Sequence, residues 1–172
     1  EVRVDSVRVS DEIYRIAGLP REKTIGNCDD FFACIHPNDR AAVRTALEAA
    51  MSPPFRFAIE HRLVRPDGTE VFVLEQGETT LDDAGKPARV NGTTLDITER
   101  KRAEARLHAS EQRFATVFHS SPTGIVLTEL STGKVVDVNE ATLNMLGISR
   151  EEMFGRNSVE LGAWPDAADR EA

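Results

Sequence analysis

Apolar and polar residues alternate along three consecutive segments in the middle of the chain. One face of the first segment carries five residues, of which four are apolar: Phe55, Phe57, Ile59, His61 and Leu63. A period of two is typical of a half-buried β-strand. Arg65-Pro66-Asp67-Gly68 then forms a turn, because proline fixes its own φ and glycine accepts a positive φ. Two further strands, over about 70–80 and 89–97, follow with a short turn between them, so we predict an antiparallel meander.

The N-terminal region has a different pattern. Residues 1–10 alternate valine with polar residues around a break at Asp5-Ser6, which predicts two short strands. We predict short helices from Ser10 to Gly18 and from Pro20 to about Ile25, and a longer one over 40–50. Phe31, Phe32 and Ile35 form an apolar cluster between them. The fold class is therefore α+β, with helices packed on one face of an antiparallel sheet.

The stretch from Asp96 to Phe118 contains no glycine or proline and predicts a helix. Asp96 and Glu99 have the spacing of a capping box. The small and apolar positions recur at intervals of four and three, which is the seam of a coiled coil: Ala103, Leu107, Ser110, Phe114 and Val117. About three heptads are marginal for an isolated dimer, so we expect a homodimer that the flanking domains help to hold.

The chain repeats part of its own pattern after this helix. Sliding it by 129 residues places Ile16 on Met145, Gly18 on Gly147 and Ile25 on Phe154. Strands are predicted at 124–130 and 134–138. The second copy stops where the first began its long helix, so we interpret it as the N-terminal half of a second domain. We expect another chain or the first domain to cover its apolar edge.

Composition narrows the possible functions. The 172 residues carry a net charge of -8 with pI ≈ 5.1, which disfavours a nucleic-acid partner. No apolar run reaches membrane-spanning length, so we expect no membrane segment in this sequence and a cytoplasmic location. Cys28 and Cys34 are expected to be free thiols, since no second pair of ligands stands at zinc spacing.

Three motifs, in their order, resemble those of PAS sensor domains. They are the 65–68 turn between strands, Ile35-His36-Pro37-Asn38-Asp39-Arg40 before a helix, and the terminal Asp96-Ile97-Thr98-Glu99-Arg100-Lys101. Residues 138–155 resemble the first half of another such domain. The resemblance implies a PAS fold with a five-stranded antiparallel sheet, short helices over one face and a pocket between them. It divides the chain into a first PAS domain at 1–97, a linker helix at 98–118 and a partial second PAS domain at 119–172.

The resemblance also suggests where a signal would enter and leave. Signal output in this family passes through a helix that leaves the last strand, so Asp96, Ile97 and Thr98 are the predicted relay. Phe57, Ile59 and His61 are candidate pocket residues. A single inward histidine is most often structural, so we assign no haem and require no cofactor. Ser158 stands where a flavin-photoreceptor subgroup carries a reactive cysteine, and adduct photochemistry is therefore not expected.

The leading hypothesis is a sensory and dimerisation module of a bacterial signal-transduction protein. Tandem copies joined by helices resemble the arrangement in sensor histidine kinases, which work in two-component phosphorelays. They also resemble cyclic-dinucleotide synthases and phosphodiesterases. A flavin or haem sensor of redox state or light, and a purely structural spacer, are the alternatives. We find no nucleophile–base pair or phosphate loop, so any catalysis is expected outside this sequence.

Overall fold

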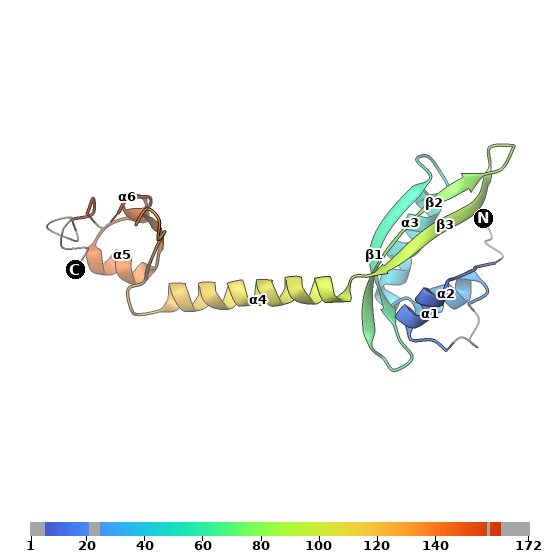
Figure 1. The fold of residues 1–172 in the computed structure, drawn as a ribbon, viewed down its shortest axis with the longest axis horizontal. Helices are drawn as coiled ribbons and strands as arrows, with labels where there is room; N and C mark the ends of the chain where they lie inside the picture. Colours follow the sequence, from blue (N-terminus) through green and yellow to red (C-terminus); the bar gives the residue numbers. More distant parts are fainter. Residues whose placement is uncertain (1–5, 21–24, 158, 163–172) are drawn as a thin grey trace. The chain divides into compact units, whose positions relative to one another are not determined.

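The computed structural model describes residues 6–20, 25–157 and 159–162. These residues group into two compact units that divide after Glu104. Figure 1 traces the elements in chain order. The expected helix from Pro20 to Ile25 falls mainly on residues 21–24, which lie outside the described residues, as does Ser158.

The first unit places helices on one face of an antiparallel sheet (Figure 1). Its helical elements are α1 (Asp11–Ala17), α2 (Cys28–Cys34), the 3-10 turn η1 (Pro37–Asp39) and α3 (Arg40–Ala49). The strands run in the order β1-β2-β3, with bounds Arg56–Val64, Glu70–Leu81 and Pro87–Asp96. The α+β class and the meander are confirmed.

The five-stranded sheet is not found in the described residues, where this sheet has three strands. Residues 6–10 form no strand, and residues 1–5 lie outside the described part. The Val7 amide donates to the Gly26 carbonyl (3.0 Å), so this segment bonds to the loop before α2. No described strand pairs with the second edge of β3.

The core of the first unit lies between the helices and one end of the sheet. Ile16 of α1, Phe32 of α2 and Val43 of α3 pack with Leu63 of β1 and Val73 of β2. The expected cluster around Phe31, Phe32 and Ile35 contains a helix, α2, whose first turn is capped by the Asn27 side chain. This core fixes the strands at the end where α4 begins.

The helix α4 runs from Thr98 to Ser120 and has 23 residues. The stretch from Asp96 to Phe118 that predicts a helix thus becomes helical at Thr98, and the helix continues to Ser120. The Asp96 carboxylate accepts a hydrogen bond from the Thr98 amide (2.9 Å), and the first helical bond joins the Lys101 amide to the Ile97 carbonyl (2.9 Å). Although α4 is long, no helix among the described residues is apolar enough to cross a membrane.

The second unit has its own small core. Strands β4 (Val126–Thr128) and β5 (Val135–Val138) pair antiparallel, followed by α5 (Glu140–Leu146) and α6 (Arg150–Met153). Val135, Val138 and Met153 are buried together. Asn139 is fully buried and joins three segments, because its side chain bonds the Phe118 and Thr123 carbonyls and the Ile125 amide.

The two units share some local features and differ in burial. Gly18 after α1 and Gly147 after α5 both adopt a left-handed conformation, with φ of 65° and 69°. Ile16 is 2% exposed, whereas Met145, which the 129-residue offset aligns with it, is 72% exposed. In the first unit the three-stranded sheet covers Ile16, and the described part of the second unit has a two-stranded sheet instead.

Candidate functional site

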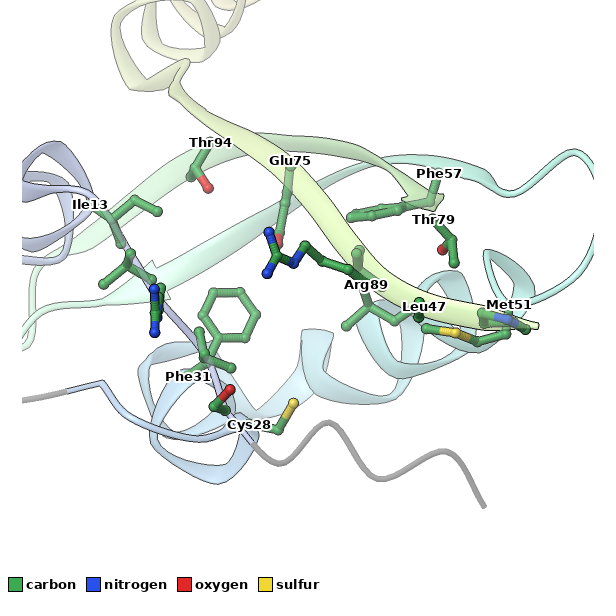
Figure 2. A pocket seen from close by; sticks show the side chains of 18 residues that line it. Ile13, Cys28, Phe31, Leu47, Met51, Phe57, Glu75, Thr79, Arg89 and Thr94 are labelled. Carbon is green, nitrogen blue, oxygen red and sulfur yellow. The ribbon is translucent and has the colours of Figure 1, made fainter. Parts of the chain in front are cut away.

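A pocket of about 490 Å³ lies between the helices and the sheet of the first unit. Its walls come from all the elements around it, with Ile13 from α1, Phe31 from α2, Leu47 from α3, Phe57 from β1 and Thr94 from β3. Figure 2 shows these side chains converging on the space between helices and strands. A cavity of this volume is in the ordinary range for small-molecule sites.

The three predicted pocket residues have different positions. Phe57 lines the pocket. Ile59 packs against the buried core, and His61 is buried and is not among the lining residues. Alternation along β1 does place all three on one face. The packing of α1 and α2 then decides which part of that face is covered by protein and which part faces the pocket.

His61 is tied to a pocket residue that the sequence did not single out. Its Nε2 lies 2.9 Å from Glu75 Oε2 on β2, and its Nδ1 lies 3.4 Å from the Arg62 carbonyl. Glu75 lines the pocket with a side chain that is 14% exposed. Both imidazole nitrogens therefore have partners, which argues against His61 as an axial ligand to haem iron. Hairpin register could have found Glu75, because His61 pairs with Val73, two residues before it.

The pocket wall also contains polar groups near its other end. Thr79 is 7% exposed, and its Oγ1 has no hydrogen-bond partner among the described residues. Figure 2 shows Thr79 next to Phe57, at the same end as Met51. The Cys28 thiol lies on the opposite wall, and burial raises its pKa, with a further contribution from the charge of Asp29. Cys28 is therefore a neutral thiol at pH 7.

The predicted relay residues join the end of β3 to β2. Ile97 is buried, and its amide donates to the Phe72 carbonyl (2.9 Å). Thr98 Oγ1 accepts from the Phe72 amide (3.0 Å). Burial raises the pKa of the Asp96 carboxyl, but its hydrogen bonds to Thr98 outweigh that effect and leave the pKa below its usual value. The start of α4 is thus bonded to the middle strand of the sheet.

A second junction, which the sequence did not predict, joins α4 to β1. The Glu60 carboxylate contacts the Arg100 guanidinium and the Lys101 ammonium, each at 2.5 Å. We call these three residues the β1–α4 clasp. The hydrogen bonds from Lys101 and Arg100 lower the pKa of Glu60. Since Glu60 alternates with Ile59 and His61, it lies on the sheet face opposite to the pocket.

A third polar cluster fixes β1 to the turn before α3. The Asp39 carboxylate accepts hydrogen bonds from the Arg62 amide (3.0 Å) and from its guanidinium (2.8 and 2.9 Å). These bonds lower the pKa of Asp39 and raise that of Arg62. The bidentate geometry is the strong form of a carboxylate–guanidinium pair. Within the described ranges, no group of three or more His, Cys, Asp or Glu gathers to hold a metal ion.

The residues of the predicted seam are exposed along α4. Leu107, Phe114 and Val117 are 62%, 55% and 66% exposed, and Ala103 and Ser110 are exposed as well. Phe118, one residue after the seam, is buried in the second unit and stacks on Phe114 at 5.6 Å. The chain by itself therefore leaves the seam uncovered.

Comparison with known proteins identifies the family. A family model described as PAS fold matches residues 6–94, and a second, described as PAS domain, matches residues 112–172. The chain belongs to the PAS family, as the motifs predicted.

The relatives include signalling proteins. An uncharacterised protein of Sinorhizobium fredii is 34% identical over 92 residues, covering 53% of this chain and 11% of its own length. The two-component sensor PprA of Pseudomonas aeruginosa is 26% identical over 134 residues, covering 78% of this chain and 14% of its own. The probable diguanylate cyclase DgcE of Escherichia coli is 22% identical over 129 residues, covering 75% and 12%. The chain thus spans less than a sixth of each relative.

A solved structure supports the same fold. It is a sensory box histidine kinase/response regulator from Burkholderia thailandensis E264, with a TM-score of 0.52 and 28% identity. The similarity covers 62% of this chain and 79% of that one. The chain is accordingly a PAS sensor region of the kind found in signalling proteins.

Proposed function

We propose that the chain is the sensory and dimerisation region of a multidomain signal-transduction protein, in which the first sheet passes its state to α4. The observation that supports this most directly is the double attachment of the helix start. Thr98 bonds to Phe72 on β2, and Arg100 and Lys101 bond to Glu60 on β1. A shift of either strand therefore changes the position of the first turn of α4.

We propose that the chain has three parts. A first PAS domain at 1–97 contains the pocket, a linker helix starts at 98, and a partial second PAS domain begins near 119. Asp96, Ile97 and Thr98 act as the relay between sheet and helix.

We further propose that α4 pairs with its counterpart in a homodimer. The seam of Ala103, Leu107, Ser110, Phe114 and Val117 is exposed in the single chain and has coiled-coil spacing. A change of about 1.4 kcal/mol in the free-energy difference between two states shifts their equilibrium tenfold. A marginal seam therefore responds to small changes at the start of α4. Met145 and Phe154 of the second unit are exposed too, and we propose that another chain or the first domain covers them.

The names of the relatives suggest which output domain the whole protein carries. PprA and the Burkholderia structure are named as two-component or histidine kinase proteins, which favours a sensor histidine kinase, and we propose a cytoplasmic location for it. A cyclic-dinucleotide enzyme is the second candidate, because DgcE is named as a diguanylate cyclase. No catalytic site is proposed in the chain itself. A visible absorption spectrum of the purified protein separates both from a flavin or haem sensor.

Hydrogen–deuterium exchange tests the relay. Glu60→Gln removes the negative charge of the β1–α4 clasp and so weakens its bonds to Arg100 and Lys101. We therefore expect faster exchange at the amides of residues 99–104. Glu78→Gln is the matched control, since Glu78 is an exposed carboxylate on β2 whose ion pair with Arg56 is 3.9 Å long. Unchanged exchange in Glu60→Gln, or an equal increase in both variants, would contradict the proposed relay.

A further inference from the structure

The sheet forms one side of the pocket, which we call its floor, and this floor is uneven. The cross-strand pairs along β2 and β3 are Glu75 with Thr94, Gly77 with Gly92, and Thr79 with Val90. Two glycines therefore face each other between two pairs that carry polar groups. A Cβ on Gly92 would have only backbone atoms as its three nearest neighbours. Glycine in a strand often marks close approach of a ligand, and here it leaves a flat stretch of backbone inside the pocket.

The walls around this floor are apolar and partly aromatic. Phe57 of β1 lies against Gly77, since a Cβ there would come within 2.8 Å of its ring. Phe31 of α2 stands on the opposite wall in Figure 2, and Leu47 and Met51 close the far end. Aromatic side chains prefer offset or edge-on contact with another ring. A planar aromatic guest matches both the floor and the walls.

Glu75 provides a largely shielded carboxylate acceptor in the pocket. Its Oε2 is bonded to His61, and its Oε1 has no hydrogen bond among the described residues. A carboxylate has about four acceptor sites, so Glu75 can accept a further hydrogen bond without losing His61. Thr79 adds a buried hydroxyl with no described partner at the other end of the floor. Both groups can pair with a guest that carries hydrogen-bond donors.

The charges around the pocket argue for a neutral guest. Arg8 and Arg89 line it, but both are exposed, and exposed cations contribute little to the binding of an anion. An ammonium group would have to lose its hydration inside the pocket, beside a carboxylate that is already bonded to His61. A neutral N–H or O–H donor avoids both costs.

We propose that this pocket binds a neutral aromatic compound of one or two rings that donates a hydrogen bond to Glu75. The inference rests on the proposed sensory function and adds the chemical class of the signal. The ring lies over the backbone at Gly92 between Phe31 and Phe57. The donor group points to Oε1 of Glu75, so the guest contacts the strand whose Phe72 is bonded to the start of α4.

The test compares indole with 1-methylindole, which has nearly the same shape but no N–H donor. We expect calorimetric titration of the whole chain to show indole binding about tenfold or more tightly than 1-methylindole. Equal affinities, or no indole binding up to its solubility, would overturn the proposal. This comparison uses the unaltered protein, so it does not depend on a variant that folds.

Variants locate the site. In Glu75→Gln we expect the preference for indole over 1-methylindole to shrink to about twofold or less, because the amide is a weaker acceptor. Glu78→Gln should bind both compounds as the unaltered chain does. If Glu75→Gln still prefers indole over 1-methylindole as strongly as the unaltered chain does, the indole N–H donates to another group and the proposed site is rejected. Faster amide exchange in Glu60→Gln together with absent indole binding would reject the ligand class and leave the relay in place. Unchanged exchange in Glu60→Gln together with indole binding would reject the relay and leave the ligand class in place.

Discussion

The substitution Leu107→Asp tests whether α4 works in pairs. Leu107 lies at the middle of the seam and is 62% exposed in the single chain. Full burial of a leucine side chain is worth about 2 kcal/mol, so covering the exposed fraction contributes about 1.2 kcal/mol per chain. An aspartate at this position adds the cost of placing a carboxylate in an apolar seam, at least about 1 kcal/mol per copy. Over two copies, the dimer should weaken about a thousandfold or more.

The assay is sedimentation equilibrium over a range of protein concentrations, with circular dichroism to show that the helix content is kept. Ala105→Asp is the control. Position 105 lies about 200° around the helix from Leu107, on the side away from the seam, and the substitution introduces the same charge into the same exposed helix. The control should dimerise like the unaltered chain. If Leu107→Asp leaves the dissociation constant unchanged, or if both variants weaken it equally, the coiled-coil seam is wrong.

Three further predictions concern stability. Thr79→Val removes a buried hydroxyl that has no described partner, so urea unfolding should show a gain of about 1–2 kcal/mol, and a loss would mean that the hydroxyl is satisfied. Because the folded state lowers the pKa of Asp39, its carboxylate stabilises the fold above about pH 4, and this contribution is lost as pH falls through the folded-state pKa. Asp39→Asn should therefore flatten the drop in unfolding free energy between pH 5 and pH 3. Parallel curves for the two proteins would contradict the role of the bonds between Asp39 and Arg62. Asn139→Ala removes the side-chain acceptor of the Ile125 amide and should abolish slow amide exchange at Ile125, which retained protection would refute.

Much of the fold was predictable because periodicity is a local signal. Alternation along β1 and the turn at 65–68 predict a hairpin, and the structure has one between β1 and β2. The α2 helix was missed since seven residues hold too few apolar positions to show a period, although Asn27 is a usable N-cap signal. Asp96, which was predicted to form a capping box with Glu99, accepts a hydrogen bond from the Thr98 amide, and a full capping box occurs at Ser149 and Glu152.

The site was less predictable because it depends on pairs that are distant in sequence. Phe57 was found by alternation, but Glu75 and Thr79 require the register of β2 against its neighbours. The β1–α4 clasp joins residues 40 apart, and nothing in the local pattern around Glu60 distinguishes it from other exposed glutamates. Which of Phe57, Ile59 and His61 reaches the pocket was decided by helix packing, which strand periodicity does not contain.

The most direct test of the central claim measures the distance between the two α4 helices when the sheet is perturbed. A nitroxide label at Gln112→Cys, with Cys28 and Cys34 replaced by serine, reports the separation between two copies by double electron–electron resonance. We predict a defined distance between copies that shifts in Glu60→Gln and stays the same in Glu78→Gln. The absence of any distance between copies, or identical distributions in all three proteins, would contradict a paired helix that receives its state from the sheet.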